Sequence, residues 1–235
     1  MVGEQALLKR SRTRLPRGVI CQPQSLQPSA FAEDLKPEEP RLGQRDRRLG
    51  DATGKGVPAA LVMSTTLGML RLAAQSYSSP GQILQQVNEA LFPYIPSNMF
   101  VTCFYAVLDP ESGLLRYANA GHDLPYLHHH DGEAKELRAR GMPLGLMSSM
   151  GYEEMELVLE AGESVLFYSD GLVEAHDPEG EMFGFPRLRA LVAEHTEERS
   201  LGECLLGELY SFVGEGWEQE DDITLVTLRC SAPLS

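Results

Sequence analysis

The feature that most constrains this chain is a glycine-rich turn that opens directly into a long apolar segment, at residues 50–75. The stretch reads GDATGKGVPAALVMSTTLGMLRLAAQ, and its glycines allow positive φ angles and a close approach by another group. Pro58 suits the first turn of a helix, where its missing N–H would have no partner. No charged residue occurs between Val57 and Leu70, and apolar side chains cover most of the helix circumference. We therefore expect a buried helix that begins at this turn.

Asp51 stands at the start of this turn and is the first candidate functional residue. A helix N-terminus offers unpaired N–H groups and the positive end of the helix dipole, and the turn around Gly54 and Gly56 aims them past this carboxylate. That combination suits a phosphate group or a metal ion bound to phosphate. Lys55 could approach the same phosphate, although a solvated turn lysine is an equal alternative. An ordinary strand-to-helix connection also explains these residues, so this stretch alone leaves both interpretations open.

Composition limits the possible partners. With 235 residues, of which 43% are hydrophobic, the chain can bury one substantial core, and we expect one folded domain. A formal charge of -14 and a pI near 4.8 argue against nucleic acid or a membrane as a partner, because nucleic acid and anionic lipid both favour clustered Lys and Arg. The longest uncharged stretch is too short for a membrane anchor, which needs about 20 residues. The four cysteines form no C-x-x-C pair and no signal-peptide pattern is present, which favours a cytoplasmic protein with reduced thiols.

Residues 1–48 differ from the rest of the chain in charge and in pattern. They hold ten of the 20 Lys and Arg residues and six of the 34 Asp and Glu residues, a charge of +4 against -18 for residues 49–235. They also hold five of the 15 prolines and show no sustained apolar period. We expect a largely disordered basic segment over 1–48, a folded domain over 49–230 and a tail over 231–235. A basic segment that docks on the acidic domain is the alternative.

Hydrophobic periodicity after the first helix predicts an α+β fold. A second helix is expected from Pro80, and two more at 185–196 and 201–213. The expected strands, in chain order, are 99–109, 114–119, 125–130, 135–140, 152–159, 163–169 and 223–230. The first two strands are expected to pair as a hairpin, and so are the fifth and sixth. Long antiparallel hairpins with helices before and after them are typical of sheets covered by helices.

Acidic residues adjoin the ends of three of these elements. Asp51 precedes the first helix, Asp170 follows the apolar strand SVLFYS, and Asp221 and Asp222 precede the apolar strand ITLVTL. One acidic residue at such a place is usually a solvated turn former. Both strands are too apolar to be exposed, however, so their carboxylates are expected to converge on one rim of the sheet.

Carboxylates that converge raise one another's pKa unless a cation lies between them. Oxygen-only ligands select hard ions, Mg²⁺ or Mn²⁺, over zinc. Two such ions roughly 3.5–4 Å apart would clamp a phosphoryl oxygen and make a bridging water nucleophilic near neutral pH. The pattern therefore favours a phosphatase that uses no protein nucleophile.

Several stretches of the chain resemble the SpoIIE/RsbU-type branch of the PPM metal-dependent Ser/Thr protein phosphatases. In the order and spacing of that family they are GDATGKGVPAAL (50–61), FVTCFYAVLD (100–109), YANAGHDLPYL (117–127), GMPLGL (141–146), VLFYSDGLVEA (165–175) and EDDITLVTL (220–228). The resemblance implies a four-layer αββα sandwich of two antiparallel sheets flanked by helices, with a binuclear Mg²⁺ or Mn²⁺ centre at one end. It also implies a phosphorylated protein substrate, such as an anti-sigma-factor antagonist in a stress response, and an upstream sensor domain or protein.

The resemblance assigns the metal ligands to particular positions of this chain. Asp51 would bridge both ions, with the backbone carbonyl of Ala52 near the site, and Asp170 and Asp221 would hold one ion. Asp222 falls where relatives carry Asn or Asp, so it ranks below Asp221. The implied catalytic residues are therefore Asp51, Asp170 and Asp221.

The start of the chain departs from the family. Relatives carry a G-G-D-x-x-D stretch on a first strand and a second apolar strand that runs into the residue matching Gly50, whereas this chain reads RLGQRDRRLGD there. Neither Asp34 nor Asp46 fits that pattern, so a ligand for the second ion and up to two N-terminal strands are expected to be missing. One hypothesis is that residues 1–48 replace the family's start through a shifted reading frame or a misplaced start codon. The alternative function is a non-catalytic, phosphatase-like binding module with an incomplete metal site.

Two groups of histidines are further candidates. His122 could orient phosphate or donate a proton, since its ordinary pKa lies near neutrality, but the fixing of a loop is the favoured role. His128, His129 and His130 resemble a metal-binding tract. In a strand, however, neighbouring side chains point to opposite faces, so only two of them could cooperate. A solvated strand end is the favoured interpretation there.

Overall fold

The computed structural model describes residues 20–26, 45–52, 57–196, 199–217, 219 and 221–231. Its elements in chain order are β1 (Ile20–Leu26), β2 (Arg45–Ala52), α1 (Val57–Ser76), α2 (Pro80–Leu91), β3 (Val101–Asp109), β4 (Leu114–Ala120), β5 (Tyr126–His128), β6 (Ala134–Glu136), β7 (Glu154–Val158), β8 (Ser164–Tyr168), the 3₁₀ turn η1 (Asp170–Leu172), α3 (Gly184–Ala193), α4 (Leu201–Val213) and β9 (Leu225–Ser231). The helix starts follow local chemistry. The Ser79 hydroxyl accepts a hydrogen bond from the backbone N–H of Gln82 before α2, and Ser200 and Glu203 form a capping box at α4.

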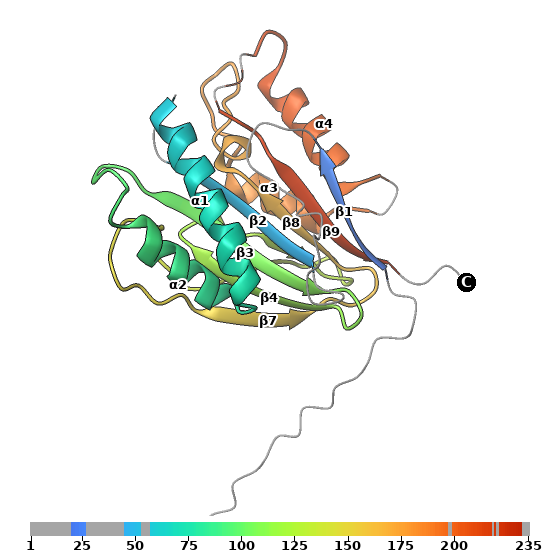
Figure 1. Cartoon of the computed structure of the whole chain (residues 1–235). Helices are drawn as coiled ribbons and strands as arrows, with labels where there is room; N and C mark the ends of the chain where they lie inside the picture. The colour runs from blue at the N-terminus through green and yellow to red at the C-terminus, as the bar shows by residue number, and fades with distance from the viewer. Residues whose placement is uncertain are drawn as a thin grey trace, which may run out of the picture.

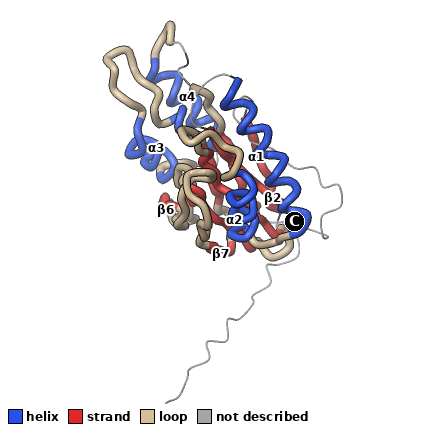
Figure 2. The backbone as a smooth tube through the Cα atoms, turned by 60° about the vertical axis from the view of Figure 1, so that its left-hand side comes forward, coloured by secondary structure: helices blue, strands red, loops and turns tan. Residues whose placement is uncertain are grey.

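The strands form two antiparallel sheets stacked face to face. One sheet has the order β2-β3-β4-β7 and the other the order β1-β9-β8-β5-β6. Helices α1 and α2 cover the outer face of the first sheet, while α3 and α4 cover the second (Figure 1). The same layering is visible after rotation, with the helices outside the strands (Figure 2). The predicted four-layer αββα sandwich is confirmed.

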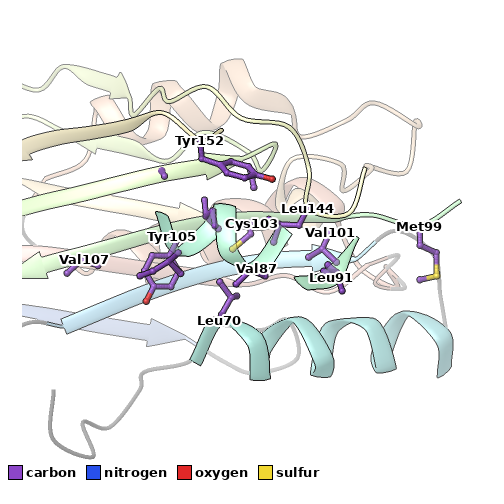
Figure 3. Packing of buried hydrophobic residues seen from close by; sticks show 14 of the residues in the cluster. Leu70, Val87, Leu91, Met99, Val101, Cys103, Tyr105, Val107, Leu144 and Tyr152 are labelled. Carbon is purple, nitrogen blue, oxygen red and sulfur yellow. The ribbon is translucent and has the colours of Figure 1, made fainter. Parts of the chain in front are cut away.

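Three apolar clusters fill the spaces between the four layers. The first joins α1 and α2 to β3 and includes Leu70, Val87 and Val101 (Figure 3). The second lies between the sheets, where Phe104 stacks on Tyr117 with ring centroids 5.4 Å apart. The third joins β8 and β9 to α3 and α4 and includes Leu188 and Leu205. The central strands β3 and β8 are thus buried on both faces, which explains their near-continuous apolar sequences.

The N-terminal strands that we expected to be missing are present. β1 pairs antiparallel with β9, with Pro23 opposite Leu228, and β2 pairs antiparallel with β3, with Asp51 opposite Thr102. Both are edge strands, where the backbone needs a partner on one side only and proline is tolerated. Because their sequences are polar and one contains proline, the apolar pattern of the sequence did not predict these two strands. The expectation of a largely disordered 1–48 is wrong for 20–26 and 45–48, and the rest of that segment lies outside the described residues.

The expected hairpin between residues 152–159 and 163–169 does not form. β7 pairs with β4 in the first sheet, whereas β8 pairs with β5 and β9 in the second. The connection at 160–162 crosses from one sheet to the other: Leu159 N donates to Gly113 O, and Gly162 N donates to Cys230 O. A tight turn between two apolar strands fits a hairpin or a crossing between layers, and the packing of the two sheets selects the crossing.

The helix α1 is only partly buried, against our expectation. Leu67 and Leu70 face the sheet, while the exposed fractions of Val57, Leu61 and Leu72 are 72%, 63% and 65%. The helix lies on the outer face of an edge of the sandwich and contacts α2, β2 and β3 on one side only. By length and composition α1 is apolar enough to cross a membrane, which is weak evidence by itself.

The strand directions divide the sandwich into two ends. The end of β2, the start of β3, the end of β8 and the start of β9 lie at one end, where His122 contacts both Thr102 and Tyr168; we call it the carboxylate end. The opposite end, which we call the distal end, holds the β3–β4 turn, the 160–162 crossing and the end of β5. The functional candidates divide between these two ends.

Candidate active site

The carboxylate end brings together residues from both sheets. Asp51, which is exposed, is the next-to-last residue of β2 and pairs with Thr102, whose hydroxyl lies 3.4 Å from the Asp51 carbonyl oxygen. Asp170 starts η1 directly after β8, and Asp221 precedes β9. The three aspartates that the sequence analysis singled out are therefore attached to strand ends at the same end of the sandwich.

His122 joins the two sheets beneath this rim. Its Nδ1 lies 3.0 Å from the Thr102 hydroxyl of the first sheet, and its Nε2 lies 3.3 Å from the Tyr168 carbonyl of the second. The Asn119 side chain fixes the turn, since it accepts from His122 N and donates to His122 O, both at 2.8 Å. Gly121, at φ +72°, allows the turn. Because a carbonyl only accepts, the contact geometry requires N–H at Nε2, which leaves Nδ1 to accept from Thr102.

His122 is neutral across the physiological range. Burial lowers its pKa to about 4, against a smaller opposing effect of the hydrogen bond to Tyr168. A group that must donate a proton near neutral pH needs a pKa near neutrality. The structure thus supports the loop-fixing role of His122. The histidine connects Tyr168 at the end of β8, two residues before Asp170, to Thr102 of β3, which pairs with Asp51.

Asp170 is held against the segment that carries Asp221. The Ser169 hydroxyl donates to Asp222 O at 2.8 Å and accepts from Thr224 N at 2.9 Å. A Cβ at Gly171 would lie 2.6 Å from Asp222 O, so only glycine allows this approach. The pKa of Asp170 is raised, first by burial and then by the charge of Asp221. The two carboxylates are therefore close enough to repel each other.

Asp123 is a member of this rim that the sequence reasoning missed. Its Oδ2 is buried and, among the described residues, has no hydrogen-bond partner. Burial, together with the smaller effects of the charges of Asp170 and Glu174, raises its pKa to about 6. Its position directly after the NAGH turn was the available signal, but a loop aspartate looks like a solvated turn former until the burial is known.

The donor set of the rim fits a hard divalent cation. Asp170, Asp221 and Asp123 offer only oxygen atoms, and their mutual repulsion is the repulsion that a bound cation relieves. Asp51 and the Ala52 carbonyl stand at the end of β2 on the same side of the sandwich. The turn that we expected to face phosphate, at Gly54, Lys55 and Gly56, lies outside the described residues. Asp34 also lies outside them, while Asp46 belongs to β2.

Comparison with known proteins gives consistent matches. The family model for Stage II sporulation protein E (SpoIIE) matches residues 48–231. Phosphoserine phosphatase RsbU of Bacillus subtilis (strain 168) is 29% identical over 184 residues, or 77% of this chain and 54% of that protein. The structure of the RsbU and RsbW domains of Rv1364c from Mycobacterium tuberculosis has a TM-score of 0.72 at 26% identity, covering 93% of this chain and 61% of that one. RsbX in complex with magnesium has a TM-score of 0.62 at 14% identity, covering 89% of this chain and 100% of that one, and shares the fold. The chain spans about half the length of RsbU.

Proposed function

This chain belongs to the SpoIIE family of phosphatase domains, and from that premise we propose that it hydrolyses phosphoserine or phosphothreonine on a regulatory protein. The substrate we infer is a phosphorylated anti-sigma-factor antagonist, delivered in the cytoplasm under the control of a sensor domain or protein. The relative RsbU, which is named a phosphoserine phosphatase, supports the reaction class. The net charge of -14 supports a protein rather than a nucleic acid as the partner.

The residues proposed to hold the metal are the Asp51 carboxylate, the Ala52 carbonyl, Asp170 and Asp221. When bound, Mg²⁺ or Mn²⁺ at such a site polarises a phosphoryl oxygen and lowers the pKa of a water molecule. The magnesium of the RsbX structure supports a hard ion. The observation that carries the proposal is a group of partly buried carboxylates at one rim: after burial, the charge of Asp221 raises the pKa of Asp170, and the charge of Asp170 raises the pKa of Asp123.

The chain's own residues position this rim. Neutral His122 holds the end of β8 against Thr102, so that Asp170 keeps a fixed place relative to the end of β2. Ser169 holds the backbone of Asp222, and with it the segment that carries Asp221. Asp123 adds negative potential beside Asp170, which favours a cation and would otherwise repel a substrate phosphate.

Hydrolysis of p-nitrophenyl phosphate and of a phosphoserine protein in the presence of Mn²⁺ tests the proposal. Asp170→Asn should reduce the rate at least about a hundredfold, because it removes a metal ligand. The matched control is Asp109→Asn, which removes the same charge from the β3–β4 turn at the distal end and should retain the wild-type rate. Equal rates for wild type and Asp170→Asn would remove the catalytic claim.

A non-catalytic binding module is the second candidate, and one observation favours it. β1 ends at Leu26, opposite Leu225 at the carboxylate end, and in the sequence no carboxylate follows until Glu33 and Asp34. The family's upstream G-G-D-x-x-D ligand for a second ion therefore has no counterpart on this strand. Calorimetric titration with Mn²⁺ separates the two candidates, because the enzyme requires two bound ions and the binding module requires none.

A further inference from the structure

A second cluster of metal-ligating side chains lies at the distal end of the sandwich. His129, His130 and Glu163 each offer one ligand atom, and these atoms all lie within 4.8 Å of one another. His129 Nε2 is 3.1 Å from Glu163 Oε1, and His130 Nδ1 is 3.8 Å from the same oxygen. The two imidazole rings have centroids 4.1 Å apart. Two nitrogens thus face one carboxylate oxygen.

The end of β5 explains why two neighbouring histidines face the same way. In a continued strand their side chains would point to opposite faces, which was the basis for our expectation of a solvated strand end. The strand instead stops at His128, and the chain turns: His129 N donates to Glu133 O, and Gly132 N donates to His129 O. The turn breaks the alternation and brings both imidazoles to Glu163, so the alternation argument does not apply to this pair. The strand end itself is solvated, as expected, since both histidines are partly exposed.

Glu163 is an unusual partner because it is almost fully buried, with an exposed fraction of 2%. Its Oε2 accepts a hydrogen bond from Glu160 N at 2.8 Å, which fixes the carboxylate and directs Oε1 to the imidazoles. A buried carboxylate needs a cationic partner, either a protonated histidine or a metal ion. The imidazoles remain accessible, with exposed side-chain fractions of 36% for His129 and 55% for His130, so an ion can enter.

Two of the three separations among the ligand atoms are compatible with a small tetrahedral site. Metal–ligand distances of about 2.0–2.2 Å place neighbouring ligand atoms roughly 3.3 Å apart, and the observed separations of 3.1 and 3.8 Å lie on either side of that value. The other nitrogen of His129, Nδ1, lies 3.0 Å from Asp131 Oδ1. A carboxylate beside the non-ligating nitrogen is the usual outer partner of a metal-bound histidine.

We propose that His129, His130 and Glu163 form a Zn²⁺ site, with Asp131 orienting His129 and a fourth position open to water. Two imidazoles and one carboxylate suit zinc and similar borderline ions rather than Mg²⁺. The site is separate from the candidate active site, because Glu163 and Asp170 flank opposite ends of β8, on the order of 20 Å apart. A metal here would clamp the β5–β6 turn to the start of β8.

Calorimetric titration of the full chain with Zn²⁺, in the presence of excess Mg²⁺ and in an Asp170→Asn background, isolates this site from the carboxylate rim. The proposal expects one ion per chain. His130→Ala and Glu163→Gln should each weaken Zn²⁺ binding at least tenfold, while Asp131→Asn should weaken it less. His176→Ala, which removes a histidine elsewhere, is the matched control and should bind as the parent does. Unchanged affinity in His130→Ala, or no binding by the parent, would overturn the proposal.

Anomalous diffraction at the zinc edge provides the second readout. A peak bounded by His129, His130 and Glu163 supports the site, and a peak only at the carboxylate rim overturns it. Because His130 is more than half exposed, its alanine variant should fold normally, which a thermal melt without metal verifies. His130→Ala therefore reports on Zn²⁺ binding even if the buried Glu163 variant fails to fold.

Discussion

The two ends of the sandwich carry different kinds of metal-ligating groups on the same two sheets. At the carboxylate end, Asp51, Asp170 and Asp221 offer oxygen only, and Asp123 adds a fourth carboxylate. At the distal end, two imidazoles face one buried carboxylate. The first set suits hard ions that keep water and bind phosphate, and the second suits zinc. The two sheets position the side chains at both ends, and the identity of those side chains determines which chemistry each end can perform.

The ends also differ in how their charges are balanced. At the carboxylate end, burial and neighbouring carboxylates raise the pKa values of Asp123 and Asp170, so negative charge there is unfavourable unless a cation is nearby. At the distal end Glu163 already has hydrogen-bond donors and imidazoles around it. A cation should therefore change the carboxylate end more strongly than the distal end.

The largest effect is expected from a comparison of two adjacent aspartates. Asp221→Asn should lower the Mn²⁺-dependent phosphatase rate by about a hundredfold or more, because its charge acts directly on Asp170. Asp222→Asn should lower the phosphatase rate much less, since Asp222 contacts Ser169 through its backbone carbonyl, which the substitution keeps. Steady-state kinetics on a phosphoserine protein measures both. A larger loss in Asp222→Asn would reverse the assignment of the ligand.

Gly171→Ala should have the next largest effect. The added Cβ would meet Asp222 O at 2.6 Å and push the segment that carries Asp221 away from Asp170. We expect a loss of roughly tenfold in Mn²⁺ affinity, as for displaced outer contacts of a metal site. Gly151→Ala is the control, because a Cβ there meets nothing within 4 Å. Calorimetry that finds the same Mn²⁺ affinity in both variants would show that this close approach does not position the site.

His122→Ala should reduce stability and activity together. The change removes one hydrogen bond from the Tyr168 carbonyl and one from the Thr102 hydroxyl, which costs about 2 kcal/mol of unfolding free energy. Urea unfolding measures this cost. Because His122 is neutral above its pKa of about 4, the pH profile of the residual activity should keep the shape of the wild-type profile. Loss of a limb of the profile near neutral pH would instead indicate that His122 transfers a proton.

Asp123→Asn should give the smallest effect, and one that depends on pH. The folded-state pKa of about 6 lies above the ordinary value of 3.8, so Asp123 favours the folded state at low pH and this stability is lost as pH rises through about 6. The variant does not ionise, so without metal it should be more stable than wild type above about pH 6, by roughly 1 kcal/mol after allowance for solvent screening. The difference should vanish below about pH 4. Thermal melts across this range measure it, and a constant difference would contradict the assignment.

Adding Mn²⁺ sharpens the Asp123 prediction. A cation at the rim neutralises the repulsion among Asp123, Asp170 and Asp221, so the advantage of Asp123→Asn should shrink or reverse when the metal is present. The same addition should leave His130→Ala unaffected, because the distal end is built for a different ion. An equal response at both ends would remove the contrast between them.

Much of the fold could be predicted from the sequence because its elements carry strong periodic signals. The strands β3, β4 and β8 and the helices α2 and α4 lie close to their expected positions. The edge strands β1 and β2 were not predicted. An edge strand is hydrogen-bonded on one side only, so it does not require apolar residues and can contain a proline such as Pro23. The pairing of β7 and β8 was wrong because periodicity does not say which sheet a strand joins.

The site was predictable only in part, for a related reason. Aspartates next to strongly apolar strands could be placed at strand ends, and so at one rim. The contribution of Asp123 depends on burial, and the cluster of His129, His130 and Glu163 depends on a turn and a strand that meet only in three dimensions. The assignment of Asp51, Ala52, Asp170 and Asp221 as metal ligands, and the division of the chain at residues 48 and 230, stay predictions.

Anomalous diffraction from crystals of the full chain soaked in Mn²⁺ would locate the metal. We expect density for manganese at the carboxylate end, in contact with Asp170, Asp221 and the end of β2 at Asp51. A Mn²⁺-soaked crystal with no peak at that rim, or with the side chains of Asp51 and Asp170 directed to separate surfaces, would contradict this expectation.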